Sequence, residues 1–159
     1  MKILFWLVVV VYVVYKIATH PRVVLSFFEI QISQLRPRIA QYLHGELSYW
    51  KGILAEFKNG DKVARTVFQN EEEIVNHIRN TEKDLNIDVS YQRLKCKYLK
   101  KDGSLIMLAH NYLIFLQCLN FFRSTKGTDA TNPAYANTAL EMGAKKSAVY
   151  RTFDELLSA

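Results

Sequence analysis

An uninterrupted apolar block opens the chain, from Ile3 to Ala18, and its only charged residue is Lys16. A lysine at the edge of such a block can reach lipid headgroups while its carbon stem stays in the apolar layer. Pro21 ends or kinks a helix, and a second apolar run follows it from Val23 to Phe28. The pattern predicts a transmembrane anchor over residues 1–20, bent at Pro21.

Two other interpretations of this block stay open. A cleaved signal peptide would end in a small-x-small site, which the residues after Lys16 do not provide. A buried core helix is the second, because the block is shorter than the roughly 20 residues that cross a bilayer comfortably. For the membrane anchor, we expect lipid or neighbouring helices to contact Leu4, Phe5, Trp6, Val10, Tyr12, Val14, Tyr15 and Lys16.

Residues 21–50 predict amphipathic connector helices. Apolar residues recur there at steps of four, four and three, at Ile39, Leu43, Leu47 and Trp50, which places them on one helical face. We expect Pro37 to open the second of these helices, because the first turn tolerates a missing N–H.

Two dipeptides predict β-hairpin turns. Asn59-Gly60 and Asp102-Gly103 each lie between runs that read as strands, and both pairs accept the positive φ of a type I′ turn. Asn70, followed by three glutamates, fits a helix start between the two hairpins. The order predicts an α+β fold, with a small antiparallel sheet and packing helices over residues 51–123. A wholly helical chain is the alternative.

Residues 105–122 form a second long uncharged stretch, interrupted by polar residues such as His110 and Gln117. We expect a strand that runs into a buried helix, with a second membrane helix as the alternative.

Residues 124–159 predict a loop and then a helical segment, with a helix over 136–157 interrupted near Gly143. The spacing of Ala139, Gly143 and Val149 resembles the helix-turn-helix pattern of DNA-binding regulators. The resemblance implies phosphate contacts by Lys145, Lys146 and Arg151. Nearby acidic residues balance these cations, however, which argues against DNA binding.

The predicted strand from Gln92 to Leu99 alternates, and it carries three cations on one side. With two lysines at the following turn, this row could contact an anion or a partner protein, although a solvated sheet face explains it as well. The residues concerned are Arg93, Lys95, Lys97, Lys100 and Lys101.

The formal net charge is +6, and the excess lies near the anchor: seven basic and three acidic residues fall between Met1 and Gly60. Basic residues beside a bilayer tend to stay on the cytoplasmic side. We therefore expect a single-pass membrane protein whose soluble domain faces the cytoplasm. The two cysteines, Cys96 and Cys118, do not make a disulfide framework, and whether they pair stays open.

Catalytic and cofactor motifs are absent from the sequence. The four histidines and two cysteines lack zinc-ligand spacing, and neither a phosphate-binding glycine loop nor a nucleophile elbow occurs. We expect no enzyme activity, no metal and no cofactor. The resulting hypothesis is a structural or accessory subunit of a membrane-associated multiprotein assembly, with protein subunits and membrane lipids as partners. A membrane-tethered nucleic-acid-binding protein is the alternative.

Overall fold

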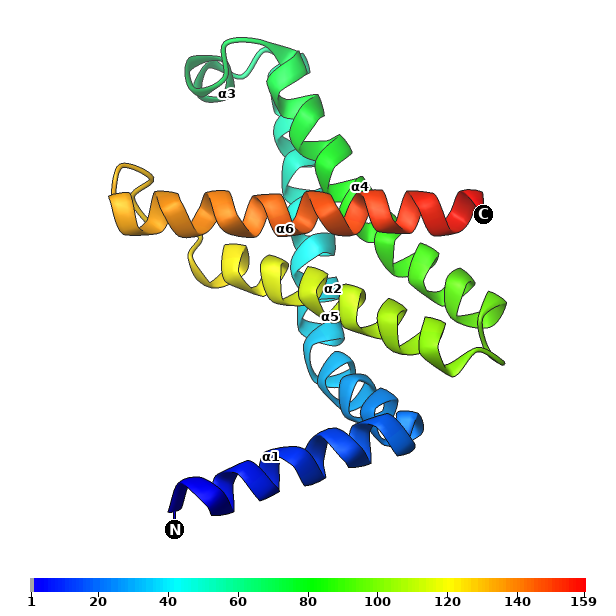
Figure 1. The fold of residues 1–159 in the computed structure, drawn as a ribbon. Helices are drawn as coiled ribbons and strands as arrows, with labels where there is room; N and C mark the ends of the chain where they lie inside the picture. Colours follow the sequence, from blue (N-terminus) through cyan, green and yellow to red (C-terminus); the bar gives the residue numbers. More distant parts are fainter. Residues whose placement is uncertain (1) are drawn as a thin grey trace.

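A computed structural model describes residues 2–159, and every regular element among them is an α-helix (Figure 1). The prediction of an α+β fold with an antiparallel sheet is therefore wrong, and the wholly helical alternative holds. The helices are α1 (Lys2–Thr19), α2 (Pro21–Lys58), α3 (Lys62–Val67), α4 (Glu71–Lys97), α5 (Asp102–Ser124) and α6 (Pro133–Ser158).

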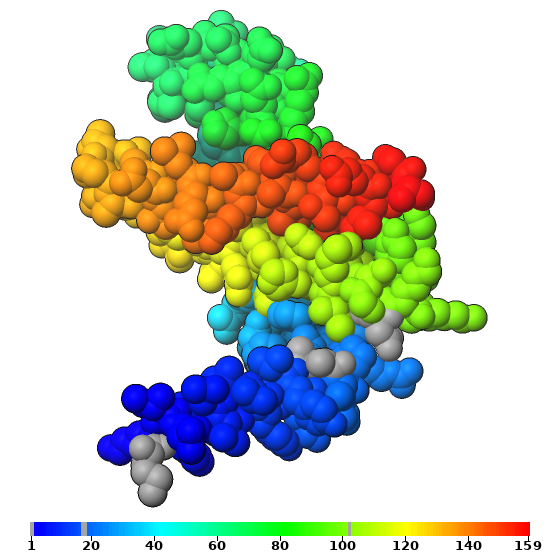
Figure 2. Space-filling view, in the orientation of Figure 1, coloured from blue at the N-terminus to red at the C-terminus, as the bar shows by residue number. Residues whose placement is uncertain are grey.

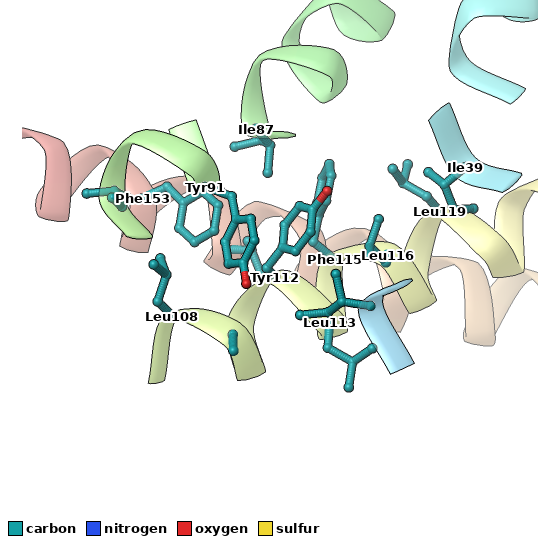
Figure 3. Close-up of a cluster of buried hydrophobic side chains, with 14 of the residues drawn as sticks. Ile39, Ile87, Tyr91, Leu108, Tyr112, Leu113, Phe115, Leu116, Leu119 and Phe153 are labelled. Atoms are coloured by element: carbon teal, nitrogen blue, oxygen red, sulfur yellow. The ribbon is translucent and has the colours of Figure 1, made fainter. Parts of the chain in front are cut away.

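Helix α5 lies at the centre of the bundle. Figure 1 shows α2 and α4 converging toward α3, while α5 and α6 run across them in opposite directions. α5 packs chiefly against α2 and α6, and its buried side chains supply much of the core (Figure 3). The buried residues that α5 contributes are Leu105, Leu108, Ala109, Tyr112, Leu113, Phe115, Leu116, Cys118 and Leu119.

The segment 105–122 is thus helical throughout, so its predicted strand-like start is wrong, while its burial agrees with expectation. Polar residues within it lie on or near the outer edge: His110 contacts the Phe28 ring, and the Asn111 side chain donates to the Met107 carbonyl. An apolar helix tolerates such residues where they can leave the packed face.

Helix α2 runs without interruption through Pro37, which corrects the prediction that Pro37 opens a new helix. A proline inside a helix costs about 3 kcal/mol, through a lost hydrogen bond and a steric clash. Ile32, Ile39 and Leu43 are buried on either side of it. Each contributes about 1.5–3 kcal/mol by burial, so packing holds the helix together across the proline. The face predicted from the Ile39 and Leu43 spacing is confirmed.

The Asn59-Gly60 pair ends α2 instead of turning a hairpin. Gly60 has φ of 84°, its N–H donates to the Phe57 carbonyl, and the Asp61 N–H donates to the Glu56 carbonyl. This pair of bonds is the Schellman arrangement that closes many helices. Asp61 then starts α3, because its carboxylate accepts from the Ala64 N–H.

The second predicted hairpin is replaced by the end of α4 and the start of α5. Tyr98 closes α4, and α5 begins at Asp102, directly where the Asp-Gly turn was expected. The buried residues Ile87, Tyr91 and Leu94 recur at steps of four and three, which is a helical face. That longer pattern outweighs the short alternation from 92 to 99.

The start of α4 at Asn70 and the middle of α6 at Gly143 each test a prediction made from the sequence. Asn70 caps α4 by accepting from the Glu73 N–H, which confirms the predicted helix start. α6 continues through Gly143 without a turn, so the predicted interruption there is wrong. No second helix is formed for a helix-turn-helix unit.

Candidate functional site: an exposed apolar helix and a polar cluster between helices

Helix α1 leaves its apolar side chains uncovered. The seven apolar residues predicted to contact lipid or neighbouring helices are each 57–70% exposed, and the predicted Lys16 lies over the Tyr12 ring at 5.8 Å. The residues exposed in this way are Leu4, Phe5, Trp6, Val10, Tyr12, Val14 and Tyr15. Figure 2 shows this helix at the outside of the molecule, below the bundle.

None of the buried core residues of the described chain belongs to α1; the first of them is Ile32. The alternative of a buried core helix is therefore wrong for this block. A soluble monomer seldom exposes an apolar surface this extensive, because each exposed apolar square ångström costs about 25 cal/mol relative to burial.

Among the described residues, one helix is long and apolar enough by itself to cross a membrane, Gly103–Ser124, and half of its most apolar window is buried. Lys2–Lys16 meets the same criterion only together with Pro21–Lys58, across a bend of 94°. The burial of α5 identifies it as the core helix of the bundle. The exposure of α1 makes it the better candidate for contact with lipid.

The predicted row of cations does not form. On a helix, Lys95 lies on the other side from Arg93 and Lys97, because residues two apart differ by about 200° whereas residues four apart differ by only about 40°. The Lys95 ammonium pairs with Glu29 at 3.0 Å, and Lys97 donates to the Ala159 carbonyl at 2.5 Å. Two of these cations therefore tie α4 to other helices.

The remaining predicted anion contacts, Lys100 and Lys101, lie exposed at the turn between α4 and α5. Lys101 also lies over the Tyr98 ring, at 5.8 Å from its centroid. The exposed Arg93 is separated from this turn by the last part of α4. Because Lys95 lies on the other side of α4 and pairs with Glu29, the five residues do not make one continuous basic surface.

A polar cluster that the sequence analysis missed joins α2, α4 and α5. Arg36 donates to both oxygens of Asp88, at 2.8 and 3.0 Å, and the Tyr112 hydroxyl donates to Asp88 Oδ1 at 2.5 Å. The hydrogen bond to Asp88 raises the pKa of Arg36. Burial, together with the hydrogen bond from the Tyr112 hydroxyl to Asp88, raises the pKa of Tyr112, so its phenol stays protonated.

The cluster continues one helical turn away at Asp84, which is 6% exposed. Lys146 of α6 donates to Asp84 Oδ2 at 2.9 Å, and the Tyr150 hydroxyl donates to Oδ1. Burial raises the pKa of Asp84, and the nearby Lys146 ammonium opposes that shift. Together the two aspartates connect α4 to α2, α5 and α6.

A cavity of about 190 Å³ lies between the two carboxylates, and His44 and apolar side chains of α2 and α5 complete its walls. Each carboxylate already has a cationic partner and a tyrosine donor, so the charges are satisfied within the protein. Within the described residues, no group of three His, Cys, Asp or Glu side chains is placed to hold a metal ion. The two carboxylates and their partners therefore join α4 to α2, α5 and α6.

Two of the three cations implied by the helix-turn-helix resemblance are paired within the protein, and the third, Arg151, is exposed. Lys145 pairs with Glu141 at 3.1 Å, and Lys146 pairs with Asp84. With no turn at Gly143, this segment presents no recognition helix. The structure leaves both cysteines as free thiols: Cys96 is exposed, and burial raises the pKa of Cys118.

Comparisons with protein-family models, with characterised proteins and with solved structures gave no match to this chain.

The sequence contains one signal for the polar cluster. On the helical face of Ile74, Ile78, Ile87 and Leu94, the position of Asp84 is the one that carries a charge. A charged residue on an apolar face predicts a buried, paired group. That signal becomes visible only when 71–97 is read as one helix, and the predicted hairpin hid it.

We predict that Tyr112→Phe lowers the free energy of unfolding by about 1–2 kcal/mol, because it removes one hydrogen bond to a charged group. Tyr91→Phe is the matched control. In the parent protein, the Tyr91 ring stacks on the Tyr112 ring with 4.0 Å between centroids, and the Tyr91 hydroxyl makes no hydrogen bond to another described residue. Urea unfolding followed by circular dichroism measures both, and equal losses in the two variants would contradict the role given to the Asp88 bond.

We also predict a pH dependence for Asp84. Its native pKa lies above the ordinary value near 3.8, so the native state binds this proton more tightly than the unfolded chain does. The resulting contribution to stability is complete below about pH 3.8 and is lost as the pH rises through the native pKa. The unfolding free energy of the parent protein minus that of Asp84→Asn should therefore fall as pH rises, and a difference that stays constant would refute this assignment.

Proposed function

We propose that this protein is a non-catalytic accessory subunit of a membrane-associated assembly, attached to the bilayer by α1. The observation that supports the proposal is the exposure of the apolar side chains of α1, outside a bundle that has a complete core of its own. Lipid covers such a surface without requiring any polar contact from it.

The dimensions and composition of α1 fit this role. Its 18 residues span about 27 Å, close to the roughly 30 Å of a bilayer hydrocarbon core. Trp6 near one end and Tyr15 near the other suit the two interfaces, where amphipathic rings are enriched. Lys16 is placed at the end of the helix nearer the bundle, where it can reach headgroups.

The other end of the molecule suits a protein partner. α3 lies at the opposite end of the bundle from α1 (Figure 1), and its Val63 and Val67 are 69% and 64% exposed. These two residues lie one helical turn apart, on the same side of a short helix. Exposed apolar residues far from the bilayer are covered most simply by another subunit.

The bend between α1 and α2 constrains how α1 enters the membrane. Figure 1 shows α1 running beneath the bundle, so that α5 and α6 occupy the same range along its axis. A bilayer perpendicular to α1 would then also enclose the charged bundle. A single-pass anchor therefore requires the 94° bend to open, whereas an α1 lying within one leaflet requires no change. We propose the single-pass arrangement, because α1 lacks the polar face of an in-plane helix.

The first test compares the full chain, a form lacking residues 2–20, and Val63→Asp/Val67→Asp. We expect the full chain to stay in carbonate-washed membranes and the truncated form to be released with its helical circular dichroism intact, because α1 supplies no core residue. In mild detergent, the full chain should migrate as an assembly larger than a monomer.

The α3 variant should remain in the membrane but lose the larger assembly, because it alters only exposed side chains. Thr66→Asp, on the same exposed helix, is the matched control for added charge. A full chain released by carbonate would refute the anchor, and a monomeric full chain without a co-purifying protein would refute the subunit role.

The second test measures topology in sealed vesicles with a membrane-impermeant maleimide. Cys96 is exposed on the bundle, and Lys2→Cys places a thiol at the far end of α1. For a single-pass anchor, intact vesicles should protect one of these two thiols and leave the other reactive. Equal reactivity of both thiols would show that α1 does not cross the bilayer.

A further inference from the structure

The first three turns of α2 carry an exposed apolar stripe. Val23, Phe27 and Ile30 are 65%, 59% and 58% exposed, and their spacing of four and three residues places them on one side of the helix. These three residues form the α2 stripe.

The opposite side of the same turns is already covered by protein. Leu25 and Phe28 pack against the core cluster, and the Phe28 ring lies 5.5 Å from the ring of His110 on α5. Glu29 is held by Lys95 of α4. The bundle therefore fixes the rotation of α2, and the α2 stripe faces away from the bundle.

The α2 stripe stops abruptly along the helix. The next positions on the same side, at steps of four, four and three, are Gln34, Arg38 and Gln41, and all three are exposed. The outward side of α2 is thus apolar in the turns adjoining α1 and polar from Gln34 to Gln41. A protein surface in contact with water along its whole length gives no reason for such a change.

We propose that the α2 stripe rests against the lipid bilayer, so that the bundle is seated on the membrane surface and its edge lies between Ile30 and Gln34. This inference rests on the proposed membrane attachment and extends it from α1 to α2. The inference is supported by the continuity of the exposed apolar surface, because the α2 stripe follows the exposed α1 directly after the bend at His20.

Lipid fits the α2 stripe better than a protein partner does. A stable protein interface covers about 800 Å² on each side, so a protein on the α2 stripe would also have to cover the adjoining α1, which the proposed anchor places in lipid. Lipid has no such minimum, since each apolar group gains as it enters the acyl boundary.

The experiment uses the full chain with Cys96→Ser, in vesicles of phosphatidylcholine and phosphatidylglycerol. The other native thiol, Cys118, is buried. An environment-sensitive NBD label is attached at Phe27→Cys or Ile30→Cys in the α2 stripe. Gln34→Cys is the matched control, on the same side one turn further on, and Val10→Cys reports on α1. Aqueous iodide and doxyl-labelled acyl chains serve as opposing quenchers.

For Phe27→Cys and Ile30→Cys, we expect blue-shifted emission, quenching by doxyl lipid and a several-fold smaller iodide quenching constant than for Gln34→Cys. A lipid-exposed label at Val10→Cys with a water-exposed label at Phe27→Cys would overturn this inference and leave the proposed anchor standing. Water exposure at Val10→Cys would overturn the anchor itself.

Two other outcomes also decide the matter. A blue-shifted Phe27→Cys label that doxyl lipid does not quench would show burial against protein, including a second copy of this chain. Doxyl quenching at Gln34→Cys equal to that at Phe27→Cys would remove the proposed membrane edge. As a check without a label, Phe27→Asp should weaken membrane retention of the full chain more than Gln34→Asp does.

Discussion

The burial of α5 between α2 and α6 is the constraint on which the rest of this structure depends. Tyr112 and Phe115 lie inside the bundle, and the neighbouring helices contribute residues such as Ile39 and Phe153 to the same core (Figure 3). Because this packing is complete within the bundle, α1 has no place in it. The exposed surface of α1 therefore follows from the arrangement of the other helices as much as from its own sequence.

The two aspartates of α4 restrict the relative positions that the packed helices can take. Apolar contacts alone tolerate sliding and rotation between helices, whereas a forked Arg36–Asp88 pair accepts few geometries. Asp84 makes the equivalent connection to α6 through Lys146. The Asp84–Lys146 pair is largely buried and the Arg36–Asp88 pair is partly exposed, and ion pairs of both kinds bring little net stability. We infer that their main effect is to fix how α4 meets three other helices.

Features that depend on one helix were accessible from the sequence, including the apolar helix of α1, the Asn70 cap and the Ile39–Leu43 face. The error came from turn residues. Asn59-Gly60 supports a positive φ in a hairpin and in a helix cap alike, and only the partners of the neighbouring N–H groups distinguish the two. Likewise, the packing that keeps α2 intact across Pro37 comes from α4 and α5, which the local pattern around Pro37 does not report.

Because α2 is one unbroken helix, its length sets the distance between the α2 stripe and α3. From Ile30, where its apolar stripe ends, to its last residue Lys58, the helix rises about 42 Å, and the bundle braces it for much of that distance. The distance of α3 from the α2 stripe and the direction of α3 around the α2 axis are therefore coupled. One residue inserted into the outer part of α2 would lift α3 by only about 1.5 Å but would swing it about 100° around the helix axis. A partner that meets α3 would sense the rotation far more than the added reach.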